Sequence, residues 1–122
     1  MLQRIDQDRI RELIPHAGAM CLLDRVETWD ATRIRCRSDS HHHADNPLRH
    51  AGRLRAICGL EYAAQAMALH GALCAGGGPR AGLLVSLRDV VCAVAELDRE
   101  PGELIVEAEH LLGDEDRMMY AF

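Results

Sequence analysis

The sequence predicts an α+β protein in which an antiparallel sheet wraps around one long central helix. Residues 53–75 form a helical stretch with apolar side chains on nearly every face, which is typical of a helix buried on most sides. Strand-like segments stand before and after it, and a curled antiparallel sheet is the element available to cover such a helix. A chain of 122 residues suits one domain, spanning residues 1–122.

Three kinds of segment precede the central helix. Residues 5–14 carry apolar side chains at helical spacing and predict a short amphipathic helix, which Pro15 ends. Residues 20–29 and 33–37 predict the two strands of a hairpin. Residues 38–52 form a long polar segment, and a loop of this length inside a compact domain is often functional.

Strands are also predicted after the helix, which ends at a run of glycines followed by Pro79. Residues 83–97 form a long segment rich in Val, Leu and Ala, and residues 104–112 alternate between apolar and charged side chains. Residues 117–122 begin a further strand. Because the sequence stops inside this strand, we expect the native protein to extend beyond Phe122.

Composition narrows the possible function classes. The net charge is −5 and the 14 basic residues, all arginines, are dispersed, so nothing resembles a nucleic-acid-binding surface. The absence of lysine excludes a Schiff-base mechanism. No apolar run approaches the roughly 20 residues that a membrane span needs. The five cysteines lack metal-type spacing, which predicts buried thiols in a reducing cytoplasm.

Arginines alternate along the second strand of the predicted hairpin. Arg33, Arg35 and Arg37 occupy every second position, which places them on one face of a strand. This pattern is typical of a solvated face, and it also suits contact with an acidic partner such as a carrier protein. Both interpretations stay open.

Glu61 is the strongest candidate for a catalytic residue. It stands in the middle of the predicted central helix among apolar neighbours, where a charged carboxylate costs several kcal/mol unless it is paired or neutral. A neutral carboxyl group suits a general acid, whereas a bond to an arginine or to the backbone is a structural role. Gln65 follows one turn later on the same face, where it can orient Glu61 or hold a substrate.

Histidines supply the candidates for a catalytic base. His16 follows Pro15 in a polar break, and His50 is the loop histidine nearest to the central helix. Consecutive histidines at residues 41–43 are expected to be solvated, because a metal site needs converging partners. His70, on the central helix, is expected to have its hydrogen bonds satisfied. No metal site is predicted.

Two stretches of the chain resemble a known family. Residues 10–26, which contain Pro-His and end in Asp-Arg-Val, resemble the opening of the 3-hydroxyacyl-acyl-carrier-protein dehydratases. Residues 59–66, Gly-Leu-Glu-Tyr-Ala-Ala-Gln-Ala, are similar to the central helix of that family. The Asn-Pro-Leu sequence at residues 46–48 further resembles the dehydratase-like proteins found with aryl-polyene and related polyketide or fatty-acid gene clusters.

This resemblance implies a hotdog fold, in which two subunits join their sheets and the active sites lie at the interface. It also implies a histidine–glutamate dyad, whose acidic member corresponds to Glu61. The histidine has no direct counterpart, because the Gly-His-Phe-Pro pattern of the family aligns near Pro47. The helix-start glycine of the family is replaced near Ala56. The candidate bases are therefore His16, which matches the Pro-His motif, and His50.

The resemblance implies dehydration of a 3-hydroxyacyl thioester held on acyl carrier protein or coenzyme A. Glu61 is expected to protonate the departing hydroxyl group, while backbone N–H groups at the helix start hold the thioester carbonyl. Arg55, Ala56 and Gln65 are the candidates for substrate binding. The reaction requires no cofactor and no metal. We expect a homodimer or higher oligomer, or a heterodimer with a related dehydratase.

Two other functions stay open. In a hotdog thioesterase, Glu61 would activate water. A noncatalytic protein that binds acyl chains, or pairs with an active dehydratase, is favoured by the missing histidine. An assay of dehydration with free-thiol release followed in parallel separates the three.

Overall fold

A computed structural model describes residues 4–14, 20–76, 87–113 and 117–122 of the chain. In chain order, the elements are α1 (Gln7–Leu13), β1 (Arg25–Trp29), β2 (Arg33–Ser38), the short 3-10 helices η2 (Ser40–His42) and η3 (Ala56–Cys58), α2 (Gly59–Cys74), β3 (Leu104–Gly113) and β4 (Met118–Ala121). Among the described residues, no helix is long and apolar enough to cross a membrane.

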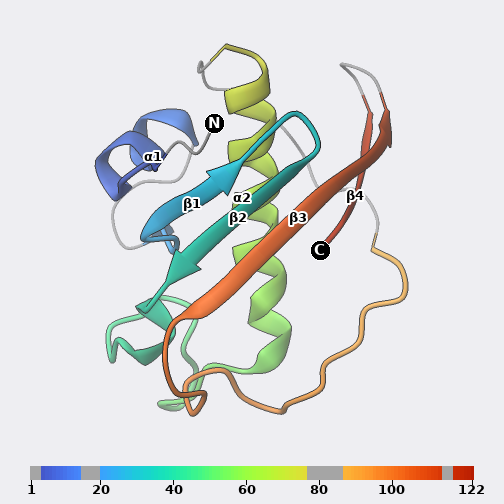
Figure 1. The fold of residues 1–122 in the computed structure, drawn as a ribbon. Coiled ribbons are helices and arrows are strands. Elements are labelled where there is room, and N and C mark those ends of the chain that lie inside the picture. Colours follow the sequence, from blue (N-terminus) through green and yellow to red (C-terminus); the bar gives the residue numbers. More distant parts are fainter. Residues whose placement is uncertain (1–3, 15–19, 77–86, 114–116) are drawn as a thin grey trace.

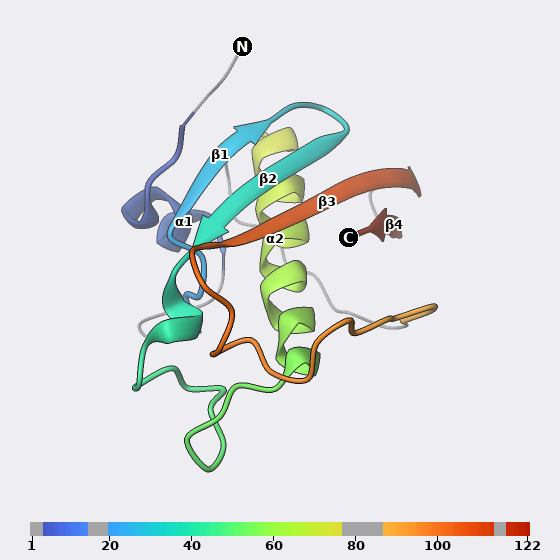
Figure 2. The ribbon, with the colours of Figure 1, turned by 60° about the horizontal axis from the view of Figure 1, so that its bottom comes forward.

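The strands form one antiparallel sheet in the order β1-β2-β3-β4, and α2 lies against one face of it (Figure 1). In both views α1 lies beside α2 at the β1 side of the sheet (Figure 2). Large buried apolar side chains from α1, the hairpin and α2 form much of the core: Ile10, Leu13, Val26, Ile34, Tyr62 and Leu69. The architecture confirms the α+β class and is compatible with the hotdog fold.

Side-chain hydrogen bonds to the backbone define the start of α1 and the turn between β1 and β2. The side chain of Asp6 accepts a hydrogen bond from the Arg9 N–H, which caps α1 at its first turn. Asp30 accepts hydrogen bonds from the backbone N–H groups of Thr32 and Arg33, each at 2.8 Å, and these bonds hold the pKa of Asp30 below its usual value. The turn between β1 and β2 is therefore an Asx-type turn at the predicted position.

The central helix begins later than the sequence predicts. Residues 53–55 are not helical, since their backbone pairs with the segment around residue 96: the Leu97 N–H donates to the Leu54 carbonyl, and Arg55 forms an isolated bridge with Glu96. The Ala56 N–H donates to the Ala95 carbonyl at 2.9 Å. Non-local pairing thus overrides local helix propensity.

The strand predicted over residues 83–97 is wrong in its described part. Residues 83–86 lie outside the described residues, and from residue 87 onward the segment forms only the isolated bridge at Glu96. Val91, in the middle of this segment, is 87% exposed. A strand needs a hydrogen-bonded partner along its length, and the described part of this chain does not supply one here.

The face of the sheet that points away from α2 carries alternating charges. Arg33 pairs with Glu109 at 2.8 Å, and Arg35 with Glu107 at 3.3 Å across β2 and β3. Arg37 instead pairs with a carboxylate on β1, the strand that borders β2 on the side opposite β3. The prediction that these arginines share one face is confirmed, and each already has an acidic partner within the sheet.

Candidate active site at the start of α2

Glu61 lies in the first turn of α2 and is half-buried. The expectation of a deeply buried carboxylate in mid-helix is therefore wrong, because the helix begins only at Gly59. At this position the partial positive charge of the helix N-terminus stabilises a negative side chain.

One backbone donor at the helix start is open. The Ala56 N–H is used by the Ala95 carbonyl, and the Cys58 N–H donates to the Arg55 carbonyl. Within the described ranges, no acceptor lies on the N–H of Ile57, whose side chain is 53% exposed. Ile57 precedes Glu61 by four residues, so the open donor and the carboxylate lie about one helical turn apart.

Gln65 is completely buried, and its side-chain amide is hydrogen-bonded to the backbone of another segment. Its Nε2 donates to the Met20 carbonyl at 2.7 Å, and its Oε1 accepts from the Leu22 N–H at 3.0 Å. This pair of bonds fastens residues 20–22 to α2, one turn beyond Glu61. In this arrangement Gln65 positions the backbone that follows the Pro-His motif.

The structure describes only one of the two candidate bases. His16 lies outside the described residues. His50 is exposed, and its backbone exchanges hydrogen bonds with Arg53. In the part of the chain that the structure describes, no hydrogen bond joins its ring to Glu61. Arg55 is also exposed and directly precedes η3, so its side chain can approach a ligand at the helix start.

A buried polar network that the sequence analysis missed adjoins Glu61. The Tyr62 hydroxyl lies 2.7 Å from the Ser40 hydroxyl and accepts a hydrogen bond from Asn46 Nδ2 at 3.1 Å. Burial raises the pKa of the Tyr62 phenol. Asn46 Oδ1 in turn accepts from the Leu48 N–H at 2.9 Å. The network fixes the Asn-Pro-Leu loop against the first turns of α2.

A cavity of about 200 Å³ opens beside the same end of the helix. It is lined by Gly59, Tyr62, Ala63, Leu97, Leu104, Ile105, Val106, Glu107 and Phe122. Most of these residues are apolar; Tyr62 and Glu107 are the exceptions. A mostly apolar cavity with few polar groups is the usual form of a small-molecule site.

Of the predictions for the remaining histidines, the one for His70 is confirmed and the one for the histidine run is wrong in part. His70 is buried and satisfied as expected: its Nε2–H donates to the Asp30 carbonyl at 2.8 Å and its Nδ1 accepts from the Tyr120 hydroxyl at 2.7 Å. The histidine run is not uniformly solvated, because His41 is 0% exposed.

The cysteines do not share one environment. Cys21 and Cys36 are buried, and desolvation raises the pKa of Cys36 to about 12. Cys58 is half-buried, and Cys74 and Cys92 are exposed, so the expectation of uniformly buried thiols is wrong. All five are free thiols.

Comparison with protein families agrees with the resemblance seen in the two motifs. A search of curated proteins gives no match. The family model of the ApeP-like proteins, described as ApeP dehydratase, matches residues 8–122. This match covers both motifs, the Asn-Pro-Leu loop and all of the sheet. The chain therefore belongs to the ApeP-like dehydratase family.

Proposed function

We propose that the protein dehydrates a 3-hydroxyacyl thioester, with Glu61 as the general acid. The observation that carries this proposal is the grouping at the start of α2. There a half-buried carboxyl group, the open N–H of Ile57 and a mostly apolar cavity lie within the same two turns. A dehydratase needs these three parts: a proton donor, a site for the carbonyl oxygen and room for the acyl chain.

The reaction is a redox-neutral elimination. A base takes the proton from C2 of the substrate, the C3–O bond breaks, and the electron pair of the C2–H bond becomes the C2=C3 double bond. The hydroxyl group leaves as water after it receives the proton of Glu61. The Ile57 N–H is placed to donate a hydrogen bond to the thioester oxygen, on which negative charge develops as the C2 proton is removed.

His16 and His50 are the candidate bases. The bonds from Gln65 to Met20 and Leu22 support His16, because they hold the backbone a few residues after it against α2, next to the turn that carries Glu61. Replacing each histidine singly by Ala tests the choice. Loss of activity in one variant, with full activity in the other, identifies the base.

The cavity suits a short acyl segment. An apolar cavity on the order of 150 Å³ holds one benzene molecule, and the cavity here is about 200 Å³. Widening it by Leu104→Ala should raise kcat/KM for longer acyl chains relative to shorter ones. The carrier, acyl carrier protein or coenzyme A, is distinguished by supplying the same acyl group on each.

We further propose that the active protein is a dimer, either of two copies or with a related dehydratase. Exposed apolar side chains gather on the segment after the central helix, at Leu87, Val90, Val91 and Val94, and Ile57 is exposed beside Glu61. Large apolar areas of this kind usually mark contacts with another chain. Sedimentation of the wild type and of Val91→Arg tests this, since a stable monomer at micromolar concentration contradicts it.

A noncatalytic acyl-binding role is the second candidate, because Pro47 stands where the related dehydratases carry their histidine. Incubation with a 3-hydroxyacyl carrier protein, with alkene formation and free-thiol release followed in parallel, separates the functions. Alkene without thiol supports a dehydratase. Thiol release supports a thioesterase, and acyl binding without either product supports the noncatalytic role.

A further inference from the structure

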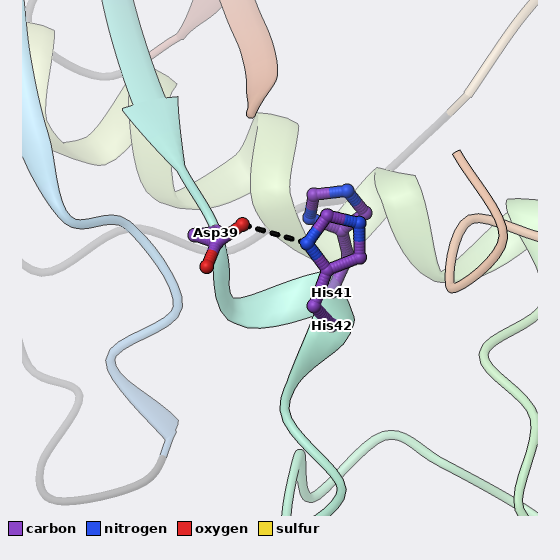
Figure 3. Close-up of side chains that lie close together, drawn as sticks. All are labelled: Asp39, His41 and His42. Atoms are coloured by element: carbon purple, nitrogen blue, oxygen red, sulfur yellow. Dashed lines mark hydrogen bonds and ion pairs between the residues drawn. The ribbon is translucent and has the colours of Figure 1, made fainter. Parts of the chain in front are cut away.

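Three side chains that no step of the proposed reaction uses converge at the end of β2. Asp39, His41 and His42 each offer one ligand atom, and these atoms all lie within 4.8 Å of one another. The two imidazole rings stack with their centroids 3.8 Å apart, beside the Asp39 carboxylate (Figure 3). The donor set is therefore two imidazole nitrogens and one carboxylate.

His41 supplies the first argument that this cluster binds a ligand. Its ring is completely buried, and its Nε2 lies 3.1 Å from the Glu100 carbonyl, which can only accept a hydrogen bond. The proton is therefore on Nε2, and Nδ1 carries a lone pair. That Nδ1 is buried and has no hydrogen-bond partner among the described residues. A buried acceptor without a partner lowers the stability of the fold by about 1–3 kcal/mol, and a ligand bound to this nitrogen would remove that cost.

His42 has the same orientation toward Glu100. Its Nε2–H donates to the Glu100 carbonyl at 2.6 Å, and its Nδ1 lies 2.7 Å from Asp39 Oδ1. Both oxygens only accept, so each ring nitrogen of His42 faces an acceptor. The Glu100 carbonyl and the Asp39 carboxylate raise its pKa, whereas the charge of Arg49 lowers it. The side of the ring that carries Nδ1, beside Asp39, is where a cation can bind.

The surroundings match those of metal-binding histidines. Such residues usually donate their second ring N–H to a backbone carbonyl or carboxylate, which fixes the tautomer and the ring orientation. Here one carbonyl, that of Glu100, serves both rings. Asp39 is held as well, because its backbone N–H donates to Asp24 Oδ2 at 2.7 Å.

We propose that Asp39, His41 and His42 form a binding site for Zn²⁺ or a similar borderline divalent metal ion. Two imidazoles with one carboxylate favour zinc over magnesium or calcium, which take mostly oxygen ligands. Asp39 and His42 are partly exposed, so water can complete the coordination.

The site has a structural consequence. Both rings hold the Glu100 carbonyl, which lies shortly before β3, and Ser40 in the same 3-10 turn contacts the Tyr62 hydroxyl. An ion that fixes these rings therefore stabilises η2, which contacts the first turns of α2. Its role is to stabilise the fold, and it takes no part in the proposed elimination.

Titration calorimetry of the chelator-treated, full-length protein with ZnCl₂ tests the proposal. We expect one ion bound per chain. His42→Ala and Asp39→Asn should each weaken binding by about 10-fold or more, because mutating even an outer-shell partner of a metal ligand typically costs this much. Zinc should raise the Tm of the wild type and leave that of His42→Ala nearly unchanged. Because His41→Ala can fail to fold, the first two variants carry the test.

His43→Ala is the matched control, since His43 is the exposed next residue of the run and lies outside the cluster. It should bind zinc as the wild type does. Three results overturn the proposal: no zinc uptake by the wild type, equal loss of affinity in His43→Ala and His42→Ala, or unchanged uptake by His42→Ala. The last result places the ion elsewhere, for example on the free cysteines.

Discussion

At the C-terminal end of α2, His70 is buried and both of its ring nitrogens are hydrogen-bonded, whereas at the N-terminal end Glu61 is half-buried and follows the exposed Ile57 by one turn. The first arrangement ties α2 to the hairpin turn and to β4. The second leaves a carboxyl group, a backbone donor and a cavity within reach of a ligand. One helix thus combines an end that stabilises the fold with an end that carries the candidate catalytic residue.

The largest effect on stability is expected at the C-terminal end of α2. His70→Ala removes a buried ring and leaves the Asp30 carbonyl and the Tyr120 hydroxyl without this partner, so the free energy of unfolding should fall by about 3 kcal/mol. Urea denaturation measures the loss. Activity per folded molecule should stay unchanged. If it falls as far as that of a Glu61 variant, the two ends of the helix do not have separate roles.

A smaller effect is expected in the buried network at the other end. Tyr62→Phe removes the hydroxyl that contacts Ser40 and Asn46 and should cost about 1–2 kcal/mol. Combining it with Ser40→Ala forms a double-mutant cycle. Because the two hydroxyls share one hydrogen bond, the double variant should lose less stability than the two single losses added together. Additive losses would show that the contact contributes nothing.

Ion pairs on the outward face of the sheet should contribute less to stability than the buried contacts at either end of α2. Arg35 is partly exposed and pairs with Glu107 and Glu27 at 3.3 and 3.8 Å. Exposed ion pairs contribute about 0–1 kcal/mol, so Arg35→Ala should change the stability by less than about 1 kcal/mol. The difference should shrink further in high salt. A larger, salt-independent loss would mean that this face is covered by another chain.

The smallest effect is the pH dependence that His42 contributes in the absence of metal. Its pKa is raised in the folded protein by the Glu100 carbonyl and by Asp39. The folded state therefore holds the proton more tightly than the unfolded state. The resulting stabilisation is fully present below the unfolded pKa and is lost as pH rises through the folded pKa. His42→Ala should remove this decline from a series of melting curves in chelator, whereas His43→Ala should keep it.

The fold was predictable from the sequence where local patterns decide it. Alternation located the hairpin and β3, and the dense apolar pattern located α2. The start of α2 was not predictable, because the backbone of residues 53–56 pairs with residues 95–97, about forty positions later in the chain. The segment after the helix was misassigned because its Val-rich composition predicts a strand, although the described part of the chain offers it no partner strand.

The candidate site was predictable only in part. Glu61 was proposed because an acidic residue interrupts an apolar helix next to a recognisable motif, and its role stays a prediction. The hydrogen bonds of Tyr62 and the backbone bonds of Gln65 connect residues that are distant in the sequence, so no local pattern reveals them. The burial of His41 was missed for a similar reason. Its environment depends on Glu100, and a loop histidine taken alone is usually solvated.

The central claim is that Glu61 supplies the proton to the departing hydroxyl group. Glu61→Gln keeps the size of the side chain and removes the transferable proton, so dehydration of a 3-hydroxyacyl carrier protein should slow by about 10²-fold or more. Thermal melting should change little, because the side chain is only half-buried. Glu109→Gln changes a partly exposed carboxylate on β3 in the same way; it is the control and should keep full activity. A Glu61→Gln protein that melts early yet dehydrates the substrate at the wild-type rate per folded molecule would contradict the account.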